Sequence, residues 1–355
     1  MSKIIFIAPY PFQRAPSQRF RFEQYIDTLR KEGHEVEIHS FLDEKGWNTL
    51  YKEGSFIKKG FSMLRSFGKR ILLMPRIKKA NHVFIHREAS MIGPPIFEWF
   101  IAKVLRKKYI YDFDDAIWLP NYSESNAKFQ RLKNYSKVKK IIKWADTVVV
   151  GNEYLSDYAK QFNQSVTIIP TTIDTLNLHT TNTKQQKDKV VIGWTGTHTT
   201  MNYLDSIIPV IQQLEKEYPI EFRIISNQCP EYKLNSLVYV PWKKETEIED
   251  LSKINIGLMP MEDTIWTKGK CGFKGLQYMA LQIPAIMSPV GMNNDIIEPE
   301  INGFFAAKKD QWYGVLKRLI VDIELRERIG VQGQKTVIDK YSVEANTPAY
   351  LKLFR

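Results

Sequence analysis

The apolar residues in the first half of the chain fall into short runs rich in β-branched and aromatic side chains, with amphipathic stretches between them. Such runs are typical of buried strands, and apolar positions at helical spacing predict helices. We expect strands at Ile4–Ala8, Val36–Ser40, Val83–His86, Tyr109–Phe113, Thr147–Val150 and Val166–Ile169, and helices at Phe20–Lys31, Ile96–Lys107 and Lys137–Trp144. Strands that alternate with helices predict a parallel sheet covered by helices.

The same alternation restarts after a polar stretch, Thr180–Lys189, which predicts a linker. Further strands are expected at Val190–Ile192, Phe222–Ile225, Val238–Val240, Ile254–Met259 and Ala285–Met287, and helices near Met201–Glu217, Glu247–Lys253, Lys274–Gln282 and Gln311–Asp322. A chain of 355 residues is long enough for two such domains. We expect one domain over residues 1–175, a second over 176–335, and a last helix within 336–355 that returns to the first.

The composition is that of an ordinary globular protein, with 43% apolar and 25% charged residues, which argues against disorder. Two cysteines, Cys229 and Cys271, are too few for a disulfide framework, so we expect a reducing compartment. The apolar run before Pro9 is too short for a signal peptide, and no run reaches the roughly 18 residues of a spanning helix. These features predict a cytoplasmic protein.

The net charge of +12 is unevenly distributed. Eight basic residues and no acidic one lie between Gly54 and Ala80, and Ile57, Phe61 and Leu64 begin an apolar stripe at helical spacing there. An apolar stripe flanked by cations is typical of a helix on an anionic membrane surface. The alternative is an amphipathic helix packed on its own domain, with its basic face in solvent. No nucleic-acid-binding motif accompanies the basic residues, so we expect no nucleic-acid partner.

Two loops that follow predicted strands are candidate anion sites, because loops after parallel strands are where ligands bind in such folds. Gly196 and Thr197 lie between a strand and a predicted helix, where free backbone N–H groups suit a diphosphate. Thr199 or Thr200 could instead simply cap that helix. Lys268, Lys270 and Lys274 surround the start of another helix. Cations at a helix amino terminus are unfavourable unless an anion binds there.

The first domain has arginines at similar places. Arg19 and Arg21, with Arg14 nearby, lie where the first helix is expected to begin, and the guanidinium group suits a carboxylate or phosphate. Arg87 follows a predicted strand, where it could bind a ligand or form a local ion pair.

Several of these segments occur together in one known family. The stretch that begins at Gly269, GKCGFKGLQYMALQIPAIMSPV, resembles the donor-site signature of family 4 glycosyltransferases. With IGWTG at Ile192 and YDFDDAIW at Tyr111, the chain looks like a bacterial cell-surface polysaccharide branch of that family. The resemblance covers nearly the whole chain and is most specific in the carboxyl-terminal half. It implies the α/β fold called GT-B, in which two Rossmann-like domains face each other across a cleft.

The resemblance also implies an activity, the transfer of a sugar from a nucleotide sugar with retention of configuration and without a metal or other cofactor. Gly196 and Thr197 would contact the donor diphosphate, with Trp194 in the same donor site. Lys270 or Lys274 would neutralise charge on the leaving diphosphate. We expect a cytoplasmic enzyme at the inner membrane surface that extends a lipid-linked glycan in surface polysaccharide synthesis, such as lipopolysaccharide, with Arg19, Arg21 and Arg87 on the acceptor side.

The chain departs from the family signature at both glutamates. Gln277 stands where one glutamate holds the nucleotide ribose, and an amide can still donate to and accept from hydroxyl groups. Gly269 stands where the other holds the donor sugar, and it brings no carboxylate; Glu262 or Asp263 could supply one. An inactive nucleotide-sugar or glycan binding protein is therefore the alternative function, and an epimerase a third.

Three aspartates, Asp112, Asp114 and Asp115, follow the expected strand Tyr109–Phe113. Asp112 and Asp114 match the Asp-x-Asp pattern of metal-binding glycosyltransferases of another fold. Asp112 still lies within the expected strand, and we expect its side chain to point away from that of Asp114. The family's functional histidine matches Asp114 or Asp115, either of which could orient the acceptor hydroxyl or accept its proton. The alternative is a loop in which the carboxylates only satisfy backbone N–H groups.

Overall fold

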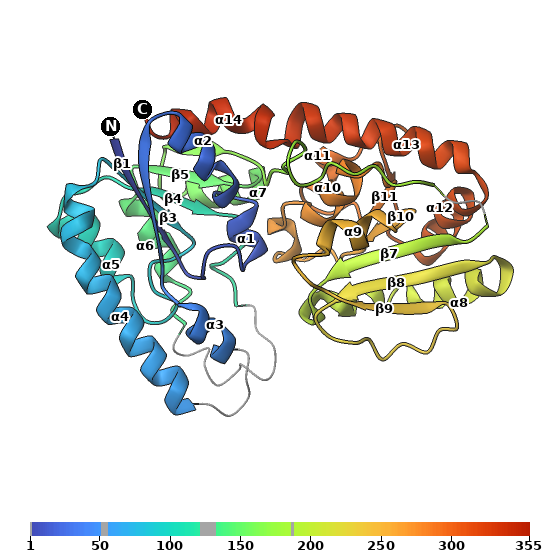
Figure 1. Cartoon of the computed structure of the whole chain (residues 1–355), viewed down its shortest axis with the longest axis horizontal. Coiled ribbons are helices and arrows are strands. Elements are labelled where there is room, and N and C mark those ends of the chain that lie inside the picture. Colours follow the sequence, from blue (N-terminus) through green and yellow to red (C-terminus); the bar gives the residue numbers. More distant parts are fainter. Residues whose placement is uncertain (1, 51–55, 121–132, 186–187) are drawn as a thin grey trace. The chain divides into compact units, whose positions relative to one another are not determined.

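The chain divides into two compact units. The computed structural model describes residues 2–50, 56–120, 133–185 and 188–355. The first unit comprises Met1–Thr171 and Thr347–Arg355, and the second comprises Thr172–Asn346 (Figure 1). The start of the basic segment, at residues 54 and 55, and residues 186 and 187 of the polar stretch lie outside the described residues.

The first unit is built on a parallel six-stranded sheet in the order β2-β1-β3-β4-β5-β6. The strands are β1 (Ser2–Ala8), β2 (His34–Ser40), β3 (His82–His86), β4 (Ile110–Phe113), β5 (Thr147–Val150) and β6 (Val166–Ile168). Every residue from Ile4 to Ala8 is fully buried, as expected for a strand covered on both faces. All six expected strands are therefore confirmed, and their carboxyl ends meet at one edge of the sheet.

Helices cover both faces of this sheet (Figure 1). They are α1 (Pro16–Arg19), η1 (Glu23–Tyr25), α2 (Ile26–Lys31), α3 (Glu44–Leu50), α4 (Phe56–Lys79), α5 (Ile96–Trp99), η2 (Phe100–Val104), α6 (Lys137–Trp144) and α7 (Glu153–Lys160). The expected helix at Phe20–Lys31 is interrupted, because Phe20 and Phe22 leave helical geometry and enter the core, where the Phe22 ring stacks on Phe6. Burial of these rings outweighs local helix propensity.

One buried arginine attaches α4 to the sheet. Arg70 donates hydrogen bonds of 2.8 Å to the carbonyls of Ala8, His39 and Ala89, which lie at or just after the ends of β1, β2 and β3. Burial lowers the pKa of Arg70 to about 9, against a smaller opposing effect of Glu98. Three backbone carbonyls thus hold a guanidinium group that forms no ion pair within the described residues.

We expect Arg70→Met to lower the free energy of unfolding by about 2 kcal/mol or more, because it leaves buried carbonyls without a donor. Arg70→Lys should recover little of this loss, since an ammonium cannot reproduce the planar set of donors. Urea unfolding of the two variants and wild type measures the effect. A lysine variant as stable as wild type would contradict this account of how α4 is attached.

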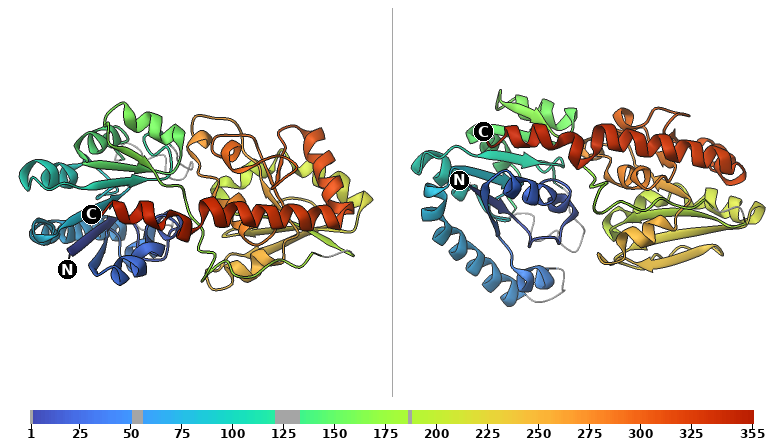
Figure 2. Two further views of the ribbon diagram at one scale, coloured as in Figure 1. Left: turned by 90° about the horizontal axis from the view of Figure 1, so that it is seen from above. Right: turned by 45° about the horizontal axis from the view of Figure 1, so that its top comes forward.

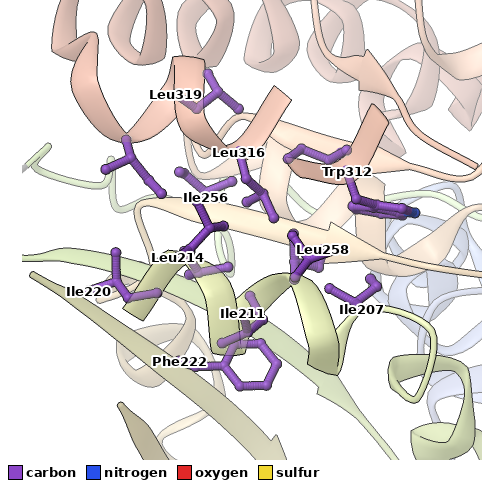
Figure 3. Packing of buried hydrophobic residues seen from close by; sticks show 14 of the residues in the cluster. Ile207, Ile211, Leu214, Ile220, Phe222, Ile256, Leu258, Trp312, Leu316 and Leu319 are labelled. Carbon is purple, nitrogen blue, oxygen red and sulfur yellow. The ribbon is translucent and has the colours of Figure 1, made fainter. Parts of the chain in front are cut away.

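The second unit contains another parallel sheet, in the order β12-β11-β10-β7-β8-β9. The strands are β7 (Val190–Gly196), β8 (Ile220–Ser226), β9 (Leu237–Pro241), β10 (Ile256–Met259), β11 (Ala285–Met287) and β12 (Phe304–Phe305). Five were expected, whereas β12 has only two residues and too little pattern to predict. Figure 3 shows one face of the core, where Ile211 and Leu214 approach the sheet from one helix and Leu316 and Leu319 from another.

Helices again connect the strands of the second unit. They are η4 (His198–Leu204), α8 (Ile208–Glu217), α9 (Glu247–Ser252), η5 (Thr267–Gly269), α10 (Phe273–Ala280), α11 (Asn293–Ile296), α12 (Lys309–Val321), α13 (Ile323–Thr336) and η6 (Val337–Tyr341). The helix expected near Met201–Glu217 is confirmed from Ile208 onward as α8, but its first part is a separate 3-10 helix, η4. Pro209, which lacks an N–H donor, falls in the first turn of α8 and suits a helix start.

The predicted linker is also wrong in its described part, because these residues are attached to the second unit. The Thr183 N–H donates to the Leu281 carbonyl at 2.8 Å, and the Gln185 side chain accepts from Arg326 at 2.8 Å. The division between the units falls earlier, after Thr171. The prediction rested on polar composition, but polar side chains of this stretch form hydrogen bonds within the second unit.

The end of the chain packs on the first unit. In the last helix, α14 (Val343–Lys352), the Tyr350 ring stacks on Tyr25 with centroids 4.0 Å apart. The centroid of the Phe354 ring lies 5.9 Å from that of Phe6, a residue of β1. The carboxyl-terminal end of the chain accordingly lies near the amino terminus (Figure 2). Tyr350 and Phe354 are both buried.

Candidate functional site

The end of β7 meets the first turn of α10 in the second unit. The Thr195 N–H donates to the Tyr278 hydroxyl at 3.0 Å, which holds α10 against the strand. Lys274 lies one turn earlier on α10 and therefore reaches the end of β7. A Cβ atom added to Gly196 would lie 2.5 Å from the Trp194 ring and 3.0 Å from Lys274 Cε. A side chain at position 196 would therefore collide with the Trp194 ring and crowd Lys274, so this close approach requires glycine.

Lys274 is a partly buried cation that has no counter-ion among the described residues. Its ammonium lies 3.4 Å from the Thr200 hydroxyl and 4.7 Å from the centroid of the Trp194 ring. In the described parts of the chain no carboxylate is within ion-pair distance of it. Burial, together with repulsion from Lys270, lowers the pKa of Lys274 to about 7. A bound anion at this place would relieve both effects.

Two other predicted donor-site residues, Lys270 and Gln277, lie near Lys274. Lys270 lies close enough to repel it, and its ammonium is 5.2 Å from the centroid of the Trp266 ring. Gln277 is buried on the same helix, three residues after Lys274, and its amide nitrogen has no hydrogen-bond partner among the described residues. Residues three apart share one face of a helix, so these two side chains are neighbours.

Two predicted donor contacts do not have the expected surroundings. Trp194 is fully buried in the core of the second unit, so it supports the Lys274 side chain and presents no surface to a ligand. Alternation along β7 placed its side chain on the covered face. Asp263 is exposed and pairs with Lys268 at 3.4 Å, which is a surface ion pair.

The turn after β7 contains contacts that the sequence did not reveal. The predicted helix cap at Thr199 or Thr200 is wrong, because η4 begins after Thr197, which makes no side-chain capping bond. Instead the Thr197 and Thr199 hydroxyls lie 2.8 Å apart, and Thr200 turns toward Lys274. The His198 N–H donates to Asn227 Oδ1 at 2.9 Å, which ties this turn to the end of β8. Only the fold brings Asn227 to this place.

A buried ionic group lies at the carboxyl edge of the first sheet. Asp112 on β4 accepts a hydrogen bond from Arg21 at 2.5 Å, and its other oxygen lies 2.6 Å from His86 Nδ1. Arg21 also donates to the Ile169 carbonyl. Burial would raise the pKa of Asp112, but Arg21 and His86 outweigh it and hold this pKa below its usual value. Arg21 was expected to contact the acceptor; the structure corrects this, since its guanidinium is buried in an internal ion pair.

A second ionic group joins three of the predicted residues. Arg87 Nε lies 2.7 Å from Asp114 Oδ1, and its Nη2 lies 2.8 Å from Asp115 Oδ2. Burial would lower the pKa of Arg87, but the two carboxylates outweigh it and raise the pKa above its usual value. Arg87 has a positive φ of 57°, a left-handed conformation that costs energy for a residue with a side chain. The group is partly exposed at the end of the sheet.

The two aspartates of the Asp-x-Asp pattern, Asp112 and Asp114, lie in different environments. Asp112 faces Arg21 and His86, whereas Asp114 faces Arg87. The two carboxylates therefore have different ionic partners, and the prediction that their side chains point apart stays a prediction. Arg19, the remaining predicted acceptor residue, is largely buried, and its guanidinium carbon lies 4.9 Å from the centroid of the Phe20 ring.

Comparison with known proteins identifies the fold. No protein-family model and no curated protein sequence matches the chain. Solved structures do match over the whole chain. A sucrose-phosphate synthase from Thermosynechococcus elongatus has a TM-score of 0.74 at 13% identity, covering 100% of this chain and 98% of its own. A glycosyltransferase from Rickettsia africae has a TM-score of 0.69 at 14% identity, covering 99% and 97%.

A third match is Anabaena HepE in complex with UDP and glucose, with a TM-score of 0.66 at 11% identity and 99% coverage of both chains. Identities this low establish the fold alone. The chain therefore has the α/β fold of GT-B glycosyltransferases, as the sequence resemblance implied. Membership of family 4 and of the surface-polysaccharide branch stays a prediction.

Proposed function

We propose that this protein is a glycosyltransferase that binds the diphosphate of a nucleotide-sugar donor at Gly196, Thr197, Lys270 and Lys274. The observation that carries the proposal is the Lys274 ammonium at the end of β7, which has a hydroxyl and an aromatic ring beside it but, among the described residues, no carboxylate. Holding a cation there without a counter-ion is unfavourable for the unliganded protein. A diphosphate supplies the missing charge.

The residues around Lys274 suit successive parts of such a donor. Backbone N–H groups after β7 would bind the diphosphate, and the positive end of α10 favours an anion at the same place. Lys270 and Lys274 would stabilise the negative charge that develops on the diphosphate as it leaves. The unpaired amide of Gln277, on the same face of α10, would bind a ribose hydroxyl. Two lysines supply positive charge here, which supports a transfer that needs no divalent metal.

The first unit would supply the acceptor side. Asp114 and Asp115 are held by Arg87 at the carboxyl edge of the sheet, where ligands bind in α/β folds. A carboxylate fixed in this way could accept a hydrogen bond from an acceptor hydroxyl and orient it for attack. We propose a glycan acceptor, carried on a lipid, and retention of configuration at the transferred sugar. The sequence resemblance supports both points.

Incubation of the purified protein with UDP-, GDP- and CMP-sugars, with a chelator present, tests the proposal. We expect slow release of one nucleotide by donor hydrolysis even without acceptor, and faster release with the correct acceptor. Lys274→Met should abolish this release, whereas Lys216→Met, at an exposed position of α8, should not. Release that is unaffected by Lys274→Met would refute the assignment.

A binding protein without transferase activity is the second candidate. It is favoured by Gly269, which lies in η5 and provides no side chain to hold the donor sugar. This candidate predicts nucleotide-sugar binding that depends on Lys274 with no release of nucleotide under any acceptor condition. Binding and turnover measured on the same preparation distinguish the two functions.

A further inference from the structure

The exposed apolar side chains of the chain are concentrated on two neighbouring helical segments of the first unit. Within the described residues, 17 large apolar side chains are exposed, and eight of them belong to α4, α5 and η2. These eight are Ile57, Phe61, Leu64, Ile71, Leu72, Ile96, Trp99 and Val104, and together they define the α4–α5 surface. The centroids of the Phe67 and Phe97 rings lie 5.7 Å apart, so α4 and α5 pack beside each other (Figure 1).

The exposed apolar residues of α4 lie opposite the side that packs on the sheet. The packed side is formed by Ser66, Arg70, Leu73, Met74 and Ile77, which are all buried. Successive helical residues are about 100° apart, so the exposed stripe is centred about 160° away from that side. Ile57 is 90% exposed, Leu64 72% and Phe61 71%. The expectation that this stripe packs on its own domain is therefore wrong, because Arg70 and its neighbours make that contact instead.

Cations accompany the apolar residues. The 24 residues of α4 contain eight basic residues and no acidic one, and only Arg70 among the eight is buried. Three exposed cations have acidic neighbours, since Arg65 and Lys69 pair with Asp43 and Arg76 lies 3.9 Å from Glu37. Lys58, Lys78 and Lys79 form no ion pair in the described structure. Further basic residues, Lys103, Arg106 and Lys108, are exposed at and after η2.

We propose that the α4–α5 surface docks on the surface of an anionic lipid bilayer. The five apolar side chains of α4 would enter the boundary between head groups and acyl chains, with α4 in the plane of the membrane over a length of about 36 Å. The flanking lysines and arginines would contact anionic head groups. Trp99 on α5 suits the same boundary, where tryptophan is enriched. None of the described helices is long and apolar enough to cross a membrane.

An anionic lipid bilayer accounts for more features of the α4–α5 surface than a nucleic acid or a second copy of this chain does. A nucleic acid would bind the basic residues of the α4–α5 surface, but it would leave the five exposed apolar side chains of α4 in water. A second copy of this chain would cover the apolar side chains, but it would bring two strongly basic helices together. An anionic bilayer satisfies both the apolar and the charged positions. This inference does not depend on the proposed sugar transfer.

Co-sedimentation with vesicles of phosphatidylcholine, alone or mixed with phosphatidylglycerol, tests the proposal. Wild type should bind the mixed vesicles, and less so as salt rises. The double variant Phe61→Ser with Leu64→Ser should weaken binding by about tenfold or more, because both side chains are exposed and only lipid contact is lost. Lys58→Gln with Lys78→Gln should weaken it roughly 25-fold, about fivefold for each lysine.

Matched controls in the second unit separate docking from general surface effects. Val321→Ser with Val331→Ser removes two exposed apolar side chains, and Lys216→Gln with Lys309→Gln removes two exposed lysines. Both control variants should bind like wild type. The proposal is overturned if wild type ignores anionic vesicles, if salt has no effect, or if the α4 variants bind as well as their controls. It is also overturned if Phe61→Ser with Leu64→Ser dissociates a lipid-free oligomer, because a second copy then covers the surface.

Discussion

Lys274→Met is expected to weaken the binding of a nucleoside diphosphate about a hundredfold, which corresponds to roughly 3 kcal/mol. Among the described residues, the Lys274 ammonium has only the Thr200 hydroxyl and the Trp194 ring as partners in the unliganded protein. Most of its interaction energy with a diphosphate is therefore gained only on binding. Calorimetric titration of wild type and variant measures the loss. Lys216→Met, an exposed lysine of the same unit, is the control and should bind normally.

The same substitution should stabilise the unliganded protein near neutral pH. The pKa of Lys274 is about 7 in the folded protein and near 10.5 when the chain is unfolded. Below pH 7 both states carry the proton, and the folded state bears the full penalty of the buried charge. Between pH 7 and 10.5 the unfolded state binds more protons, so the stability of wild type rises with pH. The advantage of Lys274→Met, about 1 kcal/mol after allowance for partial exposure, should be largest below pH 7 and disappear above pH 10.5.

A variant that loses affinity and gains stability would show that Lys274 is kept for ligand binding at the expense of the fold. Unchanged affinity, or a loss of stability at pH 6, would contradict this account of the lysine.

Asp112→Asn is expected to lower the free energy of unfolding by about 3–5 kcal/mol, the usual effect of leaving one member of a buried ion pair alone. Arg21 and Asp112 are both almost fully buried, and His86 shares the same carboxylate. The amide retains the shape of the carboxylate but removes the charge that Arg21 requires. Urea unfolding measures the shift in midpoint and slope.

A matched control and a double variant sharpen this prediction. Asp27→Asn breaks an exposed pair with Arg30 at 3.1 Å and should change stability by less than about 0.5 kcal/mol. Arg21→Met combined with Asp112→Leu should recover most of the loss, because no unpaired charge remains. Since the pKa of Asp112 is lowered on folding, its contribution is complete above the unfolded value of 3.8 and is lost as pH falls through the folded pKa. An Asp112→Asn variant as stable as wild type would show that the pair is dispensable.

The strands could be predicted from the sequence because a buried parallel strand is apolar on both faces. The continuous apolar runs at Ile4–Ala8 and Thr147–Val150 are therefore easily recognised in the sequence. Helices were harder where tertiary packing opposes local preference. Phe20 and Phe22 fit a helical pattern, but the burial of their rings against the sheet breaks the helix that this pattern predicts.

Residues of the candidate site could be predicted only where the local sequence is unusual for the helix or strand in which the residue lies. Lys270 and Lys274 stood out because cations oppose the dipole at a helix start, and Gly196 because it follows a strand. The sequence around Asn227 and Thr200 is not unusual in this way, and only the fold brings them beside the same loop. The pairing of Arg21 with Asp112 spans 91 positions, so no local pattern could distinguish a buried ion pair from an acceptor contact.

Calorimetric titration of the unliganded protein with UDP and with GDP at pH 8, in two buffers of different ionisation enthalpy and with a chelator present, tests the diphosphate site most directly. Because an anion raises the pKa of Lys274 from about 7, binding at pH 8 should take up a proton, and the heats in the two buffers should differ accordingly. We expect one nucleotide per chain, metal-independent affinity and loss of the proton uptake in Lys274→Met. Absence of binding by either nucleotide, or binding without proton uptake, would contradict the assignment of Lys274 to the diphosphate.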